Sequence, residues 1–176
     1  SDVCSSDLKK WFNLTQFRPR PRNNRWIRQL SFGSRNELFK EFDGTWSDRT
    51  FNITVLNVNF HSGDVINILF TPSYEKLDRD FRVGPGITLR KGSAYQYTRY
   101  QFGFTTANRR KISADVSGIV GTFYSGHRKD LNLGLSLRPK RGVLATLTSS
   151  FNRIEMPQGN LSTKVLRAVV NTQFSP

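Results

Sequence analysis

Side chains that could catalyse a reaction or bind a metal are few and scattered along this chain of 176 residues. His61 and His127 are the only histidines, and we expect them in turns at opposite ends of a β-meander, too far apart to share a metal or a proton. The one cluster of carboxylates, Glu75, Asp78 and Asp80, is interleaved with cations, which favours a solvated loop with local ion pairs. The sequence therefore identifies no catalytic residue, no metal site and no cofactor.

The chain is strongly basic, with 27 Lys and Arg against 13 Asp and Glu and a formal net charge of +14. Such a charge can serve nucleic-acid binding, because cations release counterions from phosphates. The basic residues are spread over the whole length, however, without the helical reading head or aromatic ladder of nucleic-acid-binding domains. We predict a solvated or lumenal basic surface and no nucleic-acid partner.

The first eight residues, Ser1 to Leu8, closely resemble the translation of a common sequencing adapter. We therefore predict that residues 1–8 are an artefact and that the natural N-terminus is missing. They contain Cys4, the only cysteine, so disulfide and thiol chemistry are excluded with them. Residues 9–176 are expected to be a fragment of one β-barrel domain.

The elements that must position these side chains are predicted to be β-strands. Hydrophobic content is 36 %, below the usual ~45–50 %, and no apolar run reaches the ~18–20 residues of a membrane helix. Segments between Gly, Pro and Asn turn signals alternate with period two, most clearly at 131–138, where four leucines alternate with Asn, Gly, Ser and Arg. The segment 51–60 changes parity, which predicts a β-bulge near Val55.

We predict an all-β fold, an antiparallel up-and-down meander forming a partial (truncated) outer-membrane β-barrel of about eight strands, preceded by the end of an earlier strand at 9–17. Tight connections at 62–64, 107–110 and 139–142 are expected to alternate with the long segment 77–94 and with intermediate turns near Asp43, Gly126 and Gly159. This alternation is typical of bacterial outer-membrane barrels. Without closure, we expect an open or half-closed sheet with unpaired edges.

Strand parity then predicts two faces. We expect the lumenal face to carry Arg99, Gln101, Asp115, Asn132, Ser136, Thr148, Asn152, Arg167, Asn171 and Gln173. We expect the lipid-facing side to carry Tyr100, Phe102, Phe104, Val116, Leu131, Leu133, Leu135, Leu137, Leu166 and Val170. A basic lumen would favour anions or acidic saccharides, whereas a plugged barrel would simply be filled by these residues.

Five aromatic residues near the ends of the strands, where an aromatic girdle is expected, are Trp46, Tyr95, Tyr97, Phe123 and Tyr124. The alternative for these residues is core or cross-strand packing in a soluble barrel.

In their order and spacing, several segments resemble the C-terminal domain of a family of bacterial proteins. They are Phe17-Arg18-Pro19-Arg20-Pro21-Arg22-Asn23, Arg25-Trp26-Ile27-Arg28, Phe60-His61-Ser62-Gly63-Asp64, Tyr74-Glu75-Lys76-Leu77-Asp78, Gly121-Thr122-Phe123-Tyr124-Ser125-Gly126 and Leu135-Ser136-Leu137-Arg138-Pro139. Members of that family carry an N-terminal family-9-type carbohydrate-binding module followed by a β-barrel domain of unknown function. The resemblance covers residues 9–176 and implies truncation at both ends. It supplies no catalytic residue.

Three functions follow as hypotheses. The first is an outer-membrane barrel domain of a Gram-negative bacterium, in contact with outer-membrane lipid and linked to saccharides through the absent N-terminal module. The second is a soluble β-barrel that binds a small ligand in its interior, which would place the leucines inside. The third, a nucleic-acid-binding β protein, predicts affinity that falls steeply with salt.

Overall fold

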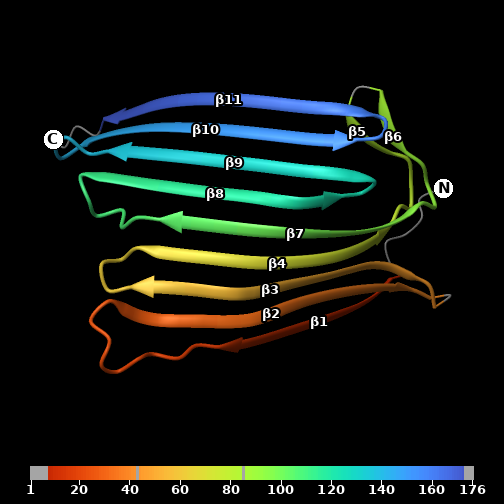
Figure 1. The fold of residues 1–176 in the computed structure, drawn as a ribbon, viewed down its shortest axis with the longest axis horizontal. Coiled ribbons are helices and arrows are strands. Elements are labelled where there is room, and N and C mark those ends of the chain that lie inside the picture. Colours follow the sequence, from red (N-terminus) through yellow and green to blue (C-terminus); the bar gives the residue numbers. More distant parts are fainter. Residues whose placement is uncertain (1–7, 43, 85, 173–176) are drawn as a thin grey trace.

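The computed structural model describes residues 8–42, 44–84 and 86–172, and all its regular elements are β-strands (Figure 1). The strands are β1 (Leu8–Phe17), β2 (Ile27–Glu41), β3 (Trp46–Phe60), β4 (Val65–Lys76), β5 (Phe81–Gly84), β6 (Ile87–Leu89), β7 (Ala94–Thr105), β8 (Ile112–Phe123), β9 (Gly126–Leu137), β10 (Val143–Met156) and β11 (Gly159–Thr172). No helix in this described part of the chain has the length and apolar character needed to cross a membrane.

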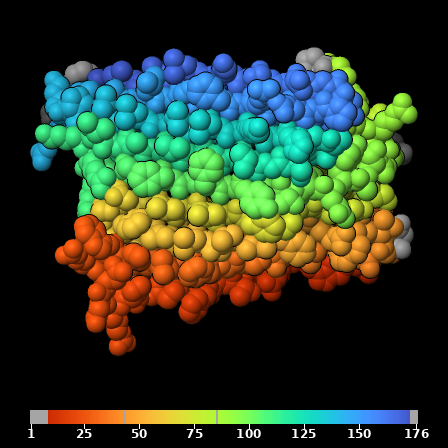
Figure 2. All heavy atoms as spheres, viewed as in Figure 1, coloured from red at the N-terminus to blue at the C-terminus, as the bar shows by residue number. Residues whose placement is uncertain are grey.

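Nine of these strands form one antiparallel sheet in the order β1-β2-β3-β4-β7-β8-β9-β10-β11, so neighbours in the sheet follow the chain. Figure 2 shows the same order as consecutive colour bands across the molecule. The antiparallel meander is confirmed, but the expected count of about eight strands is wrong. Residues 8–17 pair along their whole length with β2 and form a full strand. No closed barrel forms among the described residues, where β1 and β11 are the two edges.

The predicted β-bulge at Val55 is confirmed. Ile53 pairs with Phe70 and Leu56 pairs with Ile68, so the register between β3 and β4 shifts across Val55. The extra residue lets the apolar residues before and after it lie on the same face of the sheet.

The connections lie at two ends of the sheet. The turn end, as we call it, holds the connections 18–26, 61–64, 106–111 and 138–142, and the hairpin end holds 42–45, 77–93, 124–125 and 157–158. The expected alternation of short and intermediate connections is wrong, because 124–125 and 157–158 are two-residue turns, shorter than any at the turn end. The long segment 77–93 is confirmed as a connection, and it contains the small β5–β6 hairpin.

The buried apolar core is small and lies at the hairpin end. Leu77, Ile87, Leu89 and Met156 form its centre. Partly buried residues from the strand ends pack around it: Val83, Tyr95, Tyr124, Ile154 and Leu161. The β5–β6 hairpin thus folds against the ends of β10 and β11 (Figure 1), a tertiary contact that alternation along one strand does not predict.

Candidate functional site

The predicted lumenal residues share one face of the sheet. Residues directly opposed in antiparallel strands lie on the same face, and the pairings Thr105–Asp115, Asp115–Gly134, Gly134–Thr148 and Thr148–Arg167 run across five strands. The same reasoning places nine of the ten predicted residues on this polar face: Arg99, Gln101, Asp115, Asn132, Ser136, Thr148, Asn152, Arg167 and Asn171. Gln173 lies outside the described residues.

All ten predicted lipid-facing residues share the opposite, apolar face. They are Tyr100, Phe102, Phe104, Val116, Leu131, Leu133, Leu135, Leu137, Leu166 and Val170. Phe102 lies directly over Gly118 on the next strand, where an added Cβ would be 2.2 Å from the ring. No second layer of described residues covers this face, and Leu166 remains 73 % exposed.

From Asp130 to Leu137 of β9, the apolar side chains are more exposed than the polar ones. The four leucines of β9, from Leu131 to Leu137, are 37–40 % exposed, whereas Asp130 on the polar face is only 6 % exposed. A curved sheet crowds the side chains of its concave face and spreads those of its convex face. The polar face is therefore the concave one, and the leucines point outward.

Polar side chains on the concave face form hydrogen bonds with one another. Gln101 Nε2 donates to Thr71 Oγ1 at 3.3 Å, and Thr71 Oγ1 donates to Asn52 Oδ1 at 3.4 Å. Thr71 is 1 % exposed, so this network is closely packed. A glycine makes room for the carboxylate of Asp115, because an added Cβ at Gly134 would lie 2.0 Å from Asp115 Oδ1.

Two predicted lumenal cations are present on this face but are not brought together. The guanidinium of Arg99 lies 5.3 Å from the centre of the Tyr97 ring, and its Nε has no hydrogen-bond partner within the described chain. Arg167 lies on β11, four strand spacings from β7, which is roughly 19 Å along the sheet. The two arginines therefore do not form one anion site.

Four of the five expected girdle aromatics lie on the polar face instead. Tyr95 and Tyr97 have the parity of Arg99 on β7, and the ring of Tyr124 is 5.1 Å from Tyr95, 5.4 Å from Tyr97 and 4.7 Å from Phe123. This cross-strand packing, extended by the β5–β6 hairpin, replaces the expected girdle there. Only Trp46 lies on the apolar face.

A carboxylate anchors this aromatic cluster. Tyr97 Oη and Tyr124 Oη both donate to Glu75 Oε2, at 3.1 and 3.0 Å. Burial raises the pKa of the Tyr124 phenol far above its usual range, and the nearby Glu75 charge raises that pKa further. Tyr124 also has a left-handed backbone, with φ of 49°, a costly conformation held by the surrounding contacts. The Glu75 carboxylate thus joins β4, β7 and the β8–β9 turn.

Tryptophan and cationic residues at the hairpin end form a different aromatic group, on the apolar face, that sequence reasoning found only in part. Trp11 and Trp46 lie 6.2 Å apart by ring centres, and the Arg49 guanidinium is 5.3 Å from Trp46 and 4.7 Å from Tyr74. Lys40 also lies over Trp46, at 5.3 Å. Amphipathic rings with adjacent cations are typical of a membrane–water interface.

The histidines and carboxylates that the sequence offers as candidates for catalysis or metal binding do not come together in the fold. His61 lies in the connection 61–64 at the turn end, whereas His127 lies near the hairpin end of β9. Asp78 and Asp80 belong to the segment 77–93, while Glu75 is committed to the two tyrosines. Within the described ranges, no three His, Cys, Asp or Glu side chains are placed to hold a metal ion.

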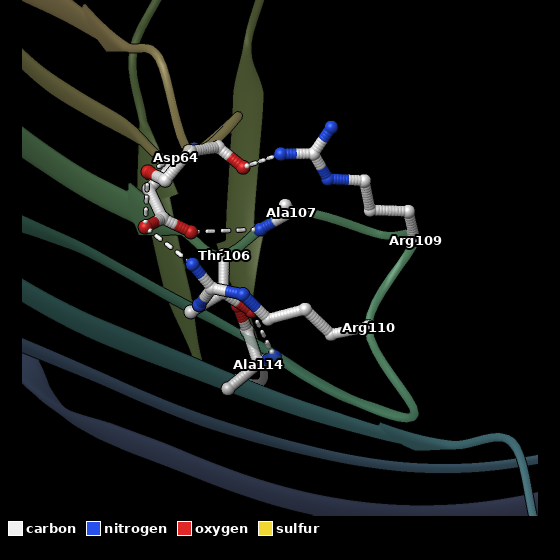
Figure 3. Close-up of polar contacts among 7 residues, drawn as sticks. Asp64, Thr106, Ala107, Arg109, Arg110 and Ala114 are labelled. Atoms are coloured by element: carbon white, nitrogen blue, oxygen red, sulfur yellow. Dashed lines mark hydrogen bonds and ion pairs between the residues drawn. The ribbon is translucent and has the colours of Figure 1, made fainter. Parts of the chain in front are cut away.

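Asp64 organises the turn end (Figure 3). Its carboxylate accepts hydrogen bonds from Ala107 N at 2.9 Å, Arg110 Nη2 at 2.8 Å and Ser62 Oγ at 2.7 Å. The Ser62 hydroxyl, the Ala107 amide and Arg110 hold the pKa of Asp64 below its usual range. Arg109 Nη2 adds a bond to Ser62 O at 2.8 Å, so the β3–β4 and β7–β8 connections are joined.

Comparison with models of protein families, with curated proteins and with solved structures finds no match for this chain.

Proposed function

We propose that the chain is part of an outer-membrane β-barrel of a Gram-negative bacterium, with its apolar face toward lipid and its polar face toward the interior. The observation that carries the proposal is the outward row of leucines on β9, which are more exposed than the polar residues between them. Exposure of a large apolar side chain to water costs about 1.5–3 kcal/mol relative to burial, and hydrocarbon removes that cost.

Strand length is consistent with a membrane crossing. The strands β7, β8 and β9 each have 12 residues, which corresponds to roughly 40 Å of chain. At a tilt of about 40°, such strands rise roughly 30 Å and exceed an apolar band of ~25 Å by a few ångströms. The Trp11–Trp46–Tyr74 group then lies where one aromatic girdle is expected.

The two edges of the sheet support a larger barrel. β1 and β11 each pair on one side only, and unpaired backbone groups are costly in hydrocarbon. We infer that further strands complete the barrel in the membrane. The family resemblance supports a carbohydrate-binding module as the companion of this barrel, and saccharides as its ligands.

A soluble barrel with an internal ligand is the second candidate. It requires the leucine face to be enclosed, whereas Leu131 to Leu137 face outward in this sheet. The small core at the hairpin end, centred on Leu77 and Ile87, is also on the polar side and does not cover the leucines. The burial pattern thus favours the membrane over the soluble barrel.

Adjacent residues on opposite faces provide the test. In a Cys4→Ser background, a polarity-sensitive fluorophore is attached to Leu133→Cys or to the matched control Asn132→Cys, and the full chain is refolded into vesicles containing brominated lipid. We expect bromine to quench the fluorophore at position 133 and not at 132. Quenching at position 132 alone would show that the polar face, and not the leucine face, meets lipid. A chain that stays in buffer, with position 133 shielded from an aqueous quencher, would establish the soluble barrel.

A further inference from the structure

The two ends of the sheet differ sharply in charge. The four connections of the turn end contain ten Lys and Arg residues and one carboxylate, Asp64. The four connections of the hairpin end contain four Lys and Arg residues and three carboxylates. These cations are distributed over residues 18–141 of the sequence, and the meander brings them together at the turn end. We call the ten cations of the turn end the basic rim.

The basic rim has little internal compensation. Nine of its ten side chains are exposed, and Arg138 is half-buried. The Asp64 carboxylate is engaged by Arg110, Ser62 and the Ala107 amide. The side chains of Lys111, Lys140 and Arg141 make no hydrogen bond or ion pair within the described part of the chain. The rim therefore presents a surplus of positive charge to an external anion.

Hydrogen bonds hold parts of the rim in fixed relative positions. Asp64 joins the β3–β4 and β7–β8 connections, and Arg138 Nη1 donates to the carbonyls of Asn108 and Arg110, joining the β9–β10 connection to them. Gly63, with φ of +90°, brings the first two connections close, since its added Cβ would lie 3.1 Å from Ala107 Cβ. Three of the four connections at the turn end are thus held together by side-chain hydrogen bonds.

We propose that the basic rim docks on the phosphates of an anionic phospholipid leaflet and so orients the sheet in the membrane. This inference rests on the proposed function, because the apolar face must enter hydrocarbon for the rim to reach the headgroups. Trp26 and Phe17, each 66 % exposed, lie beside the rim, and the Arg25 guanidinium is 5.0 Å from the Trp26 ring. Exposed aromatics beside clustered cations favour a lipid headgroup layer over duplex nucleic acid.

The test compares two triple variants of the full chain with equal loss of charge. One replaces rim cations (Lys111→Gln, Lys140→Gln, Arg141→Gln), and its matched control replaces exposed cations of the hairpin end (Arg79→Gln, Arg90→Gln, Lys91→Gln). Binding is measured on phosphatidylcholine vesicles with and without phosphatidylglycerol, over a series of NaCl concentrations. We expect the rim variant to lose on the order of 10- to 100-fold in affinity for the anionic vesicles, while the control keeps most of its affinity.

Several outcomes would overturn the inference. Equal losses in both triple variants would show a general effect of net charge, and no loss in the rim variant would remove the rim as a docking surface. Tighter salt-dependent binding to duplex DNA than to anionic vesicles, lost in the rim variant, would assign the rim to nucleic acid. Quenching of the position-133 fluorophore in neutral vesicles separates the two proposals, because the membrane barrel stands if that quenching persists while the anionic preference is absent.

Discussion

The C-terminal strands β7 to β10 and the N-terminal pair β1–β2 differ in how strictly apolar and polar residues are sorted between the two faces of the sheet. In β9, every second residue from Leu131 to Leu137 is leucine, and the residues between them are polar or glycine. In β1 and β2, the face that is apolar elsewhere carries Asn13, Thr15, Ser34 and Asn36. Phe12 and Leu14, 54 % and 53 % exposed, are on the opposite face. Strict alternation reflects a constant environment on each side of a strand.

Within the N-terminal pair, the outward polar side chains bond to each other. Thr15 Oγ1 donates to Asn13 Oδ1 at 3.2 Å, and Ser34 Oγ donates to Asn36 Oδ1. These bonds give each polar side chain a partner, which lowers the free-energy cost of any apolar environment on this face. The apolar face is therefore best defined on β4, β7, β8 and β9, and polar side chains interrupt it on β1 and β2.

The strongest test of this difference introduces the same charge on the apolar face of both regions. We expect Leu131→Arg to destabilise the vesicle-inserted chain by about 2–4 kcal/mol, as arginine does near the bilayer midplane. Ser34→Arg, on the same face of β2, should cost clearly less. Urea titration of the vesicle-bound chain, followed by tryptophan fluorescence, measures both. Equal costs would show that the two regions meet the same environment.

A second test compares glycines packed against backbone. An added Cβ would lie 2.0 Å from Thr98 O at Gly121 and 2.4 Å from Thr15 O at Gly33. We expect Gly121→Ala to cost about 1–3 kcal/mol by overpacking. Gly33→Ala should cost less, because the edge strand β1 is free to move away. Both costs are read from urea unfolding midpoints in detergent.

Gly103 offers the control for these glycines. On the polar face of β7, its added Cβ would meet only Asn67 Cβ, at 3.9 Å. Gly103→Ala should therefore leave the unfolding midpoint nearly unchanged. A loss at position 103 as large as that at 121 would show that glycine flexibility, rather than close packing, sets the cost.

The smallest expected effect concerns Asp64, which joins the connection of the N-terminal strands β3–β4 to that of β7–β8. Because folding lowers the pKa of Asp64, its stabilisation is present above the ordinary carboxyl value of ~3.9 and is lost as pH falls through the lowered value. Between pH 7 and pH 2.5, wild type should therefore lose more thermal stability than Asp64→Asn. Asp78→Asn, at an 84 % exposed side chain, is the control and should follow wild type.

The sequence predicts the structure correctly where the informative pattern lies within a single strand. The alternation at 131–138 predicts which side chains share a face, and the change of parity around Val55 predicts the bulge. The prediction fails where distant segments meet. The β5–β6 hairpin packs on β10 and β11 and against Tyr95 and Tyr124, and no local pattern contains that contact. Likewise, the basic rim exists only because the meander returns to the same end every second strand.

The number of strands in the sheet decides whether its two edges could pair with each other in an antiparallel way. Each antiparallel pairing reverses direction, and nine strands in a row leave β1 and β11 running the same way (Figure 1). Joined directly, they would form a parallel seam. A ring that is antiparallel throughout requires an odd number of added strands, which gives the even total of bacterial barrels. Any segment proposed to complete the ring can be screened by this parity alone, because two or four strands would leave the seam parallel.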